Sequence, residues 1–387
     1  MKLATETGKI KGLEAQNQMA TRFPGNGSRD FRGQGERKIG DLGAGSTEFL
    51  TENEMTDNSL QSNRIITRDR ATRLIEGGWQ AADLHVHTFY SYDVVPTREV
   101  DPLVLYERAR ARGMSFICFT DHDTMDAYDR VGWTREDLVT GVEVKILDRK
   151  KVGHTVHLNV YMLNRKQFAE IETIAGTSGD IERLVEYLKE ENLPFIFNHP
   201  FWHEPGEKLN PAAVAELSGM FPVLEYNLGR IGKLNRLVLE LAASKNKGVA
   251  AGTDSHTGDI GRIFTVARGN NFREFYESIK KGSAWLVAED LTYNRIKNEI
   301  RNRLEMILNS GDWVMNKEGL KMETGNALAD AVIETLSRGR EEALAFRREA
   351  VKIMARMVSR TGLPARLYLR KQNLLASRIR QELNLAA

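Results

Sequence analysis

Two histidines one residue apart stand out in the stretch DLHVHTFYSYD, from Asp83 to Asp93. In a β-strand, residues i and i+2 point to the same side, so His85 and His87 are expected to project together. Such a pair could bind a metal ion, or it could be two polar residues on the solvent face of a strand. The stretch alone leaves both alternatives open.

Further histidines and carboxylates recur at the ends of apolar runs, and all eight histidines lie in or beside this series. The series continues with His122 between Asp121 and Asp123 in FTDHD, Glu143 in GVEV, His154 and His157 in HTVHLNVY, His199 in FNHP, and Asp254 and His256 in GTDSH. Imidazole and carboxylate groups form the ligand set expected for Zn²⁺, Mn²⁺ or Fe²⁺. The recurrence therefore favours a metal site over a solvent-facing pair.

These residues need a scaffold, and β-type runs alternate with helical patterns from about Gln80 to Asp290. The alternation predicts an α/β body with a mostly parallel sheet. The expected strands are AADLHVH, MSFICFT, TGVEVKI, HTVHLNVYML, FIFNHP, PVLEYN and GVAAGTD. Seven repeats favour a closed or nearly closed barrel, in which C-terminal strand ends meet on one face and form the active site.

The expected helices have recognisable ends. They are RDRATRLIEGG, DPLVLYERARARG, DIERLVEYLKEEN, PAAVAELSG, KLNRLVLELAASKNKG and NFREFYESIKKG. Asp101 and Asp180 are expected N-caps, and Gly113 and Gly248 are expected just past helix ends.

Composition divides the chain into three expected regions. Residues 1–63 are polar, and seven of the 21 residues from Gly25 to Gly45 are glycine, which predicts a disordered, flexible N-terminal extension. Residues 64–290 form the α/β body. Residues 291–387 carry apolar residues at helical spacing and hold 18 Lys/Arg against 11 Asp/Glu, which predicts a basic helical C-terminal region.

Several classes of protein fit the composition poorly. No run approaches 18 apolar residues, so no transmembrane helix and no membrane partner are expected. The N-terminus lacks the apolar segment of a signal peptide, and the single Cys118 cannot form an internal disulfide. Cys118 is expected to be a buried small side chain. A cytoplasmic location fits these features, and a homo-oligomer is compatible with them.

The ordered motifs HVHTFYSYD, TDHD, GVEV, NHP and GTDSH resemble those of the PHP (polymerase and histidinol phosphatase) superfamily, from about Ala82 to Asp290. EYNLGR and DIGRIFTVARG continue the resemblance. It implies a distorted (β/α)7 barrel of the PHP type with a trinuclear metal centre. It implies one metal held by His85, His87, Glu143 and Asp254, a second sharing Glu143 with His157 and His199, and a third held by Asp93, His122 and His256.

Two positions leave alternatives. His154 and His157 would lie on opposite faces of a regular strand, and the resemblance favours His157, which leaves His154 at the surface or behind a ligand. Many relatives have Ser-Asp-Gly where this chain has Ser91-Tyr92-Asp93. Tyr92 could therefore displace Asp93 from the third metal, and Asp101 is a poorer substitute because it suits a helix cap.

Two or three divalent ions (Zn, Mn or Fe) suit the hydrolysis of a phosphate ester by metal-activated water. The expected catalytic set is Asp254 and His256 with Arg230 and Arg262, since arginine binds phosphate oxygens in a bidentate manner. Each arginine could equally be a solvated loop charge. Asp121 could orient a ligand histidine or satisfy a turn, while His203 and Trp202 could contact the substrate or only pack.

Four functions compete at this point. The preferred one is a phosphoesterase acting on a small-molecule phosphomonoester or nucleotide. The alternatives are a nuclease or phosphodiesterase that binds nucleic acid through the basic C-terminal helices, and a non-catalytic PHP scaffold. An amidohydrolase also begins with two histidines spaced in this way, but TDHD and GTDSH fit that class less well.

Overall fold

The computed structural model describes residues 64–309, 353 and 356–384. The expected N-terminal extension, residues 1–63, lies outside the described residues, as does most of the helical pattern at 326–360. The described residues all fall within one unit that spans Thr51–Ala387.

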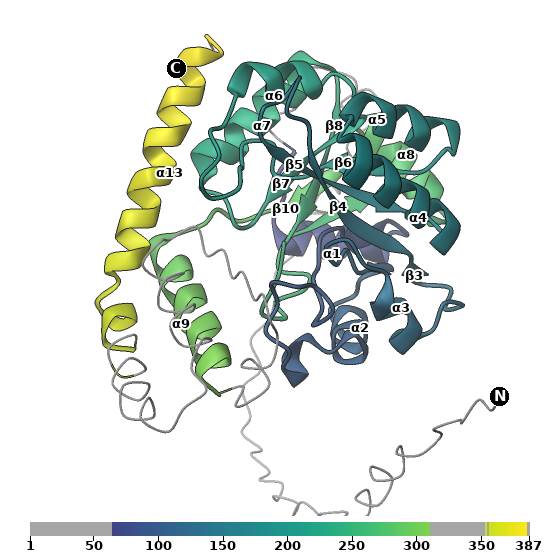
Figure 1. Cartoon of the computed structure of the whole chain (residues 1–387). Coiled ribbons are helices and arrows are strands. Elements are labelled where there is room, and N and C mark those ends of the chain that lie inside the picture. Colours follow the sequence, from purple (N-terminus) through teal and green to yellow (C-terminus); the bar gives the residue numbers. More distant parts are fainter. Residues whose placement is uncertain (1–63, 310–352, 354–355, 385–387) are drawn as a thin grey trace, which may run out of the picture. The chain divides into compact units, whose positions relative to one another are not determined.

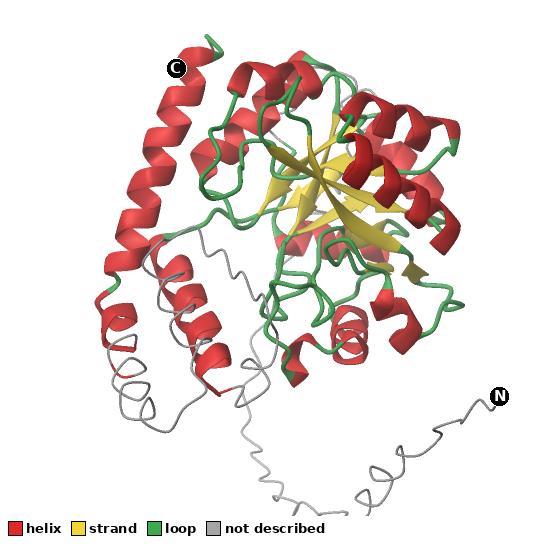
Figure 2. Ribbon diagram, in the orientation of Figure 1, coloured by secondary structure: helices red, strands yellow, loops and turns green. Residues whose placement is uncertain are grey.

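In the described part of the chain, strands form two five-stranded sheets (Figure 2). The first has the order β10-β9-β1-β2-β3 and the second β4-β5-β6-β7-β8. The first consists of β1 (Gln80–Asp83), β2 (Phe116–Cys118), β3 (Leu138–Val139), β9 (Phe264–Ala267) and β10 (Trp285–Val287). The second consists of β4 (Gly141–Leu147), β5 (Thr155–Tyr161), β6 (Phe195–Phe197), β7 (Val223–Asn227) and β8 (Gly248–Gly252).

Strand directions are mixed, so the two sheets are less uniformly parallel than predicted. The pairs β1–β2, β2–β3, β6–β7 and β7–β8 are parallel, whereas β1–β9, β9–β10, β4–β5 and β5–β6 are antiparallel. The connection from Leu147 to Thr155 is too short for a crossover, which needs about a dozen residues, so the chain returns as a hairpin. The short strands β3, β9 and β10 were not predicted.

Two isolated bridges connect the sheets. Val86 pairs with Ser255, and His122 pairs with Glu143, both in parallel orientation. No continuous ladder joins the two sheets among the residues described. The first bridge nevertheless places the chain around His85 and His87 beside that around Asp254 and His256, so the seams between the sheets bring the expected ligands together.

Helices cover the outside of the strands (Figure 1). They are α1 (Arg68–Glu76), η3 (Arg98–Val100), α2 (Pro102–Ala111), α3 (Asp126–Val131), α4 (Arg165–Thr173), η4 (Ile174–Ser178), α5 (Ile181–Glu190), α6 (Pro211–Leu217), α7 (Gly232–Ser244) and α8 (Phe272–Lys280). In α5 the apolar residues Ile181, Leu184, Val185 and Leu188 repeat at helical spacing and are all buried. Each such side chain contributes about 1.5–3 kcal/mol when it leaves water.

The helix ends agree with the sequence at three of four positions. Asp101 caps α2 by accepting from Leu103 N, and Asp180 caps α5 by accepting from Glu182 N and Arg183 N. Gly113 follows α2 with a left-handed φ of 77°. The prediction for Gly248 is wrong: α7 ends at Ser244, and Gly248 begins β8 at a place where a Cβ would collide with Ile279 O.

Two helices of the C-terminal region confirm the helical prediction there. They are α9 (Tyr293–Asn309) and α13 (Leu363–Glu382), and α13 packs against α6, α7 and α9. Arg380 Nη2 lies 2.9 Å from Glu240 Oε1 on α7 and ties α13 to the body. Among the described helices, none combines the length and apolar character needed to cross a membrane.

Candidate metal centre

All nine expected metal ligands converge in one buried cluster. Their ligand atoms form four overlapping groups: His87, Asp93, His122 and His256; His85, His87 and Asp254; His85, Glu143 and His199; and His122, Glu143 and His157. Within each group the atoms lie within 4.8 Å of one another. We call His85, His87, Glu143, His157, His199 and Asp254 the inner set, and Asp93, His122 and His256 the outer set.

Glu143 lies at the middle of the inner set. Its Oε1 is 3.2 Å from both His157 Nδ1 and His199 Nε2. Its Oε2 is 3.1 Å from His85 Nε2 and 3.2 Å from His87 Nε2. Donors around one tetrahedral Zn²⁺ ion at about 2.0–2.1 Å lie roughly 3.3 Å apart, so these spacings suit shared cations.

His85 and His87 point the same way, as the i, i+2 spacing predicted. Their Nε2 atoms are only 3.1 Å apart and both face Asp254 Oδ1, at 3.5 and 3.3 Å. His85 Nδ1 donates to Glu225 Oε1 at 2.7 Å, and His87 Nδ1 lies 2.9 Å from Ser91 Oγ. Because the Nδ1 atoms are engaged, both Nε2 lone pairs are directed at the same space, the arrangement expected of metal ligands.

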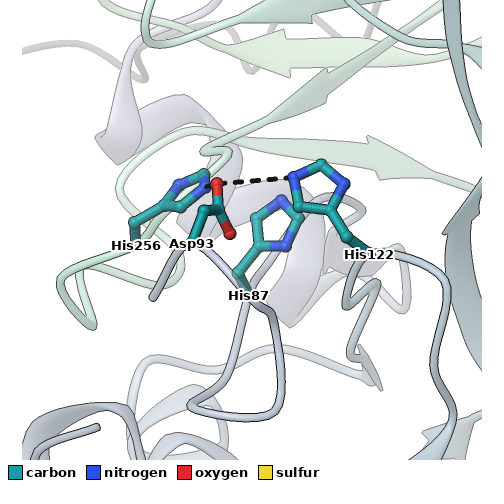
Figure 3. A group of neighbouring side chains, drawn as sticks. All are labelled: His87, Asp93, His122 and His256. Carbon is teal, nitrogen blue, oxygen red and sulfur yellow. Dashed lines mark hydrogen bonds and ion pairs between the residues drawn. The ribbon is translucent and has the colours of Figure 1, made fainter. Parts of the chain in front are cut away.

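In the outer set, Asp93 lies beside His256 and His122 although Tyr92 precedes it. Asp93 Oδ2 lies 2.7 Å from His256 Nε2 and 3.5 Å from His122 Nε2. Figure 3 shows the side chains of this group directed toward one another. Tyr92 instead stacks on the outer side of His122, with ring centroids 4.9 Å apart, and is 38% exposed. Tyr92 therefore does not displace Asp93.

Three residues that support the cluster were not predicted. Glu225 on β7 accepts from the His85 ring and, through Oε2, from His199 N at 2.8 Å. Asn198 Nδ2 donates to Glu143 Oε1 at 2.7 Å, and Ser91 Oγ accepts from His122 N at 3.0 Å. Glu225 lies 140 residues from His85 in sequence, so no local spacing signals the pair. The EYN stretch was part of the resemblance, but the sequence did not predict that Glu225 would orient His85.

Backbone strain gathers at the cluster. Asp123, His199 and Asp254 have φ values of 49°, 25° and 51°, in the region that non-glycine residues rarely adopt. Such conformations cost about 1–3 kcal/mol each and persist where the surroundings enforce them. Hydrogen bonds do so for two of them: His199 N donates to Glu225, and Asp254 N donates to His85 O at 2.8 Å.

Charge in the cluster is arranged to keep its carboxylates ionised. Burial raises the pKa of Glu143, but the surrounding histidines outweigh it and hold that pKa well below its usual range. The same balance holds the pKa values of Asp93 and Asp254 well below theirs. Burial lowers the pKa values of His199 and His256, which leaves these rings neutral and ready to bind a metal.

Buried side-chain nitrogen and oxygen atoms that lack a hydrogen bond indicate that the cluster fits metal ions. Among the described residues, Asp93 Oδ1, His122 Nδ1 and His157 Nε2 are buried and have no hydrogen-bond partner, although His122 Nδ1 lies 3.2 Å from Glu143 Oε2. A buried polar atom without a partner is costly, and a bound cation would satisfy it. Nine imidazole and carboxylate groups with such atoms are a donor set for Zn²⁺, Mn²⁺ or Fe²⁺.

Three other expected candidates lie outside the cluster. His154 precedes β5 and is buried rather than at the surface, and it belongs to none of the four groups. Asp121 accepts from Thr88 N and Thr88 Oγ1, at 2.6 and 2.7 Å, so it fixes the turn after His87 and bonds no ligand ring. His203 Nδ1 donates to Glu204 O at 2.9 Å.

The two expected phosphate-binding arginines differ in their surroundings. Arg230 and His199 line one small hollow, and among the described residues the buried Arg230 Nε has no hydrogen-bond partner. Its guanidinium carbon lies 5.9 Å from the ring centroid of Trp202, which packs on His157 at 4.7 Å. Arg262 is 43% exposed and pairs with Asp259 and Glu289, so its charge is already compensated.

The PHP domain model matches residues 83–290 of this sequence, which is more than half of the chain. The chain therefore belongs to the PHP domain family. The match ends before α9, so α9 and α13 lie beyond it. No curated protein matches the chain.

Solved structures resemble the chain only distantly. PsfC from Pseudomonas syringae PB-5123 is 15% identical, with 59% of this chain and 98% of that chain covered and a TM-score of 0.43. A protein from Bifidobacterium adolescentis assigned as a metal-dependent phosphoesterase is 17% identical, with 50% and 94% covered and a TM-score of 0.34. The lesion-specific endonuclease PfuEndoQ from Pyrococcus furiosus is 15% identical, with 54% and 58% covered and a TM-score of 0.37. Similarities at this level do not bear on activity.

Proposed function

We propose that this protein is a metal-dependent phosphoesterase that hydrolyses a small-molecule phosphate ester, with two or three divalent ions held by the inner and outer sets. The observation that carries the proposal is the convergence of nine imidazole and carboxylate ligands in one buried cluster of a PHP domain. Bound metal ions in such a site lower the pKa of water and neutralise phosphoryl oxygens. Zn²⁺, Mn²⁺ and Fe²⁺ all suit the donor set.

The protein's own residues position the reactants. Glu225 and Ser91 fix the orientation of the His85 and His87 rings, so their lone pairs need no rearrangement when ions bind. Arg230 has an unpaired Nε beside His199, where it can donate to a phosphoryl oxygen. In the reaction, water oxygen bonds to phosphorus, the bond to the alcohol oxygen breaks, and that oxygen takes up a proton.

We also propose that the two sheets together form the distorted seven-stranded barrel that the resemblance implied. Strand pairing connects β1 to β2, and it connects β4 through β8 in sequence order. The two isolated bridges connect the ends of these two groups of strands. In this arrangement His122–Glu143 links β2 to β4, and Val86–Ser255 links β8 to β1. Both seams carry expected ligands, so the metal ions would hold the seams together.

An assay with each metal in turn over phosphomonoesters, phosphodiesters and short oligonucleotides tests the function. We expect metal-dependent release of inorganic phosphate from monoesters, and loss of that activity in the His85→Ala/His87→Ala double variant. A variant at the buried but uninvolved His154, His154→Gln, is the matched control, because it removes a histidine without touching the cluster.

The outcomes separate the competing functions. Cleavage of oligonucleotides alone would replace the proposal with a nuclease, for which the exposed Arg366, Arg370 and Lys371 on α13 would supply backbone contacts. Bound metal without hydrolysis of any phosphate ester would indicate a non-catalytic scaffold. Activity that survives both metal removal and the double variant would contradict the proposal outright.

A further inference from the structure

A cation from outside the family-matched segment lies near the outer set. Helix α9 begins at Tyr293, after the last matched residue, and carries Arg303. Arg303 Nε donates to Glu299 Oε1 at 3.1 Å, one turn earlier on the same helix. Glu299 in turn accepts from Thr257 Oγ1 at 3.3 Å. Because Thr257 directly follows the expected ligand His256, this chain of contacts places Arg303 beside the metal centre.

The helix is held with this face toward the body. Ile296, Glu299 and Arg303 lie three and four residues apart, so they share one face of α9. Ile296 is buried, and the Arg303 side chain is only 26% exposed. Helix α9 also contacts α13, which is tied to α7, and Figure 1 shows the two helices side by side. Arg303 is therefore held in place and is not a freely solvated charge.

Electrostatics agree with this placement. Burial lowers the pKa of Arg303, but nearby carboxylates outweigh burial and raise it. Those carboxylates are Glu299, Asp93 and Asp254. Arg303 also helps to lower the pKa of His256. Its charge thus acts on Asp93 of the outer set and on Asp254 of the inner set.

The charge balance points to an anion. Four carboxylates, Asp93, Glu143, Asp254 and Glu225, would offset four of the six positive charges that three divalent ions bring. Arg303, although paired with Glu299, would then face a positively charged centre, and an anion between them would offset the repulsion. Only its Nε is hydrogen-bonded among the described residues, so both Nη groups keep donors for that anion.

We propose that Arg303 binds a terminal phosphoryl oxygen of the substrate at the outer set and that the protein therefore prefers phosphomonoesters to phosphodiesters. A monoester has three non-bridging oxygens and up to two negative charges, so one oxygen remains for an arginine when the others face metal ions. A diester has two non-bridging oxygens and one charge. This inference rests on the phosphoesterase function proposed above.

The test compares Arg303→Gln with Arg301→Gln, which removes the same charge from an exposed position on the same helix. For metal-loaded protein, we expect Arg303→Gln to weaken binding of inorganic phosphate, measured by calorimetry, roughly 10- to 100-fold. We expect a similar fall in kcat/KM for p-nitrophenyl phosphate and a change of less than about threefold for bis(p-nitrophenyl) phosphate. Arg301→Gln should match the wild type in all three measurements, and Arg303→Lys should recover part of the phosphate affinity.

Metal content and the thermal midpoint distinguish binding from a structural role. Both should be unchanged in Arg303→Gln if the residue binds substrate. Equal losses for monoester and diester, or loss of metal together with phosphate affinity, would overturn the inference. If Arg303→Gln equals the wild type while the wild type hydrolyses monoesters, the inference fails and the proposed function stands. If the wild type neither binds phosphate nor hydrolyses any ester, the proposed function fails and takes the inference with it.

Discussion

Glu143 and Asp93 illustrate two ways in which this chain positions an expected metal ligand. Glu143 belongs to the inner set, lies within strand β4, and contacts five histidines with its two oxygens. Asp93 belongs to the outer set, lies in the loop after β1, and contacts two histidines. Its side chain is 20% exposed, whereas that of Glu143 is fully buried. The inner set thus includes two residues within strands, Glu143 and His157, whereas all three residues of the outer set lie outside the strands.

The two carboxylates also differ in their supporting hydrogen bonds. In the inner set, Glu225 holds His85 and His199, and Asn198 holds Glu143. In the outer set, Ser91 holds His122, but Asp93 Oδ1 is buried without a hydrogen-bond partner among the described residues. We infer that the inner ions bind tightly and that the outer ion exchanges more readily, because a ligand without supporting contacts is less well oriented.

The largest effect should come from Glu143→Gln, which keeps the shape of the side chain and removes its charge. Because this carboxylate contacts five histidines, kcat/KM for p-nitrophenyl phosphate should fall roughly 1,000-fold or more. Glu277→Gln on the surface of α8 is the control and should leave activity unchanged. Retention of more than a tenth of wild-type activity would break the distinction between the two sets.

Asp93→Asn should have a smaller effect that depends on metal concentration. With one outer ligand weakened, kcat/KM should fall about 10- to 100-fold at low metal and recover partly as metal is added. Asp126→Asn, an exposed change in α3, provides the comparison. A loss as deep as that of Glu143→Gln, with no recovery, would show that the sets do not act separately.

Glu225→Gln tests whether support of the inner set matters at a distance from the ions. The variant still accepts hydrogen bonds but loses the charge that orients His85 Nδ1–H, so metal affinity should fall about 10- to 100-fold. Competition with a chromogenic chelator measures this affinity. An unchanged affinity would mean that the strands alone orient His85.

The smallest expected effect is a dependence of folding stability on pH. We expect it in the metal-free protein and not in the metal-loaded protein. Burial lowers the pKa of His122, but the charges of Glu143 and Asp93 outweigh it and raise that pKa to about 10. A histidine whose pKa is raised on folding stabilises the protein fully below about pH 6.5, and this contribution disappears as the pH rises through about 10. The thermal midpoint of metal-free protein should therefore decrease as the pH is raised from about 6.5 to about 10.

Metal-loaded protein is the control for that pH dependence. A metal held by His122 would require the deprotonated ring, so the thermal midpoint of the loaded protein should change little over the same range. Parallel curves for the two forms would show that His122 does not pair as a cation with Glu143 and Asp93.

Local spacing and the resemblance together singled out the nine residues that converge in the cluster, because i, i+2 pairs, strand ends and motif order are visible in the chain. His85 and His87 share a side of the chain as expected, and Asp93 reaches His256 although Tyr92 precedes it. The direction of β5 was missed: His157 belongs to the cluster from within an antiparallel strand, not from a C-terminal strand end. The residues of HTVHLNVY indicate a strand but not its direction. Only the short connection from Leu147 to Thr155 indicates that β5 runs antiparallel to β4.

Contacts between distant segments could not be predicted in this way. Glu225 acts on His85 across 140 residues, and Asn198 acts on Glu143 across 55. Arg303 lay in a segment whose apolar spacing indicated only a helix, with no sign of the surface it packs on. These contacts can be identified only from the folded structure, because the fold brings together residues that are distant in sequence.

The metal-to-protein ratio, measured by mass spectrometry on wild type, Asp93→Asn and Glu143→Gln after identical loading and desalting, tests the central claim most directly. The three ligand sets implied by the resemblance predict close to three ions per chain for the wild type, about two for Asp93→Asn and about one for Glu143→Gln. A wild type that binds no divalent ion, or a Glu143→Gln variant that keeps the full complement, would contradict it.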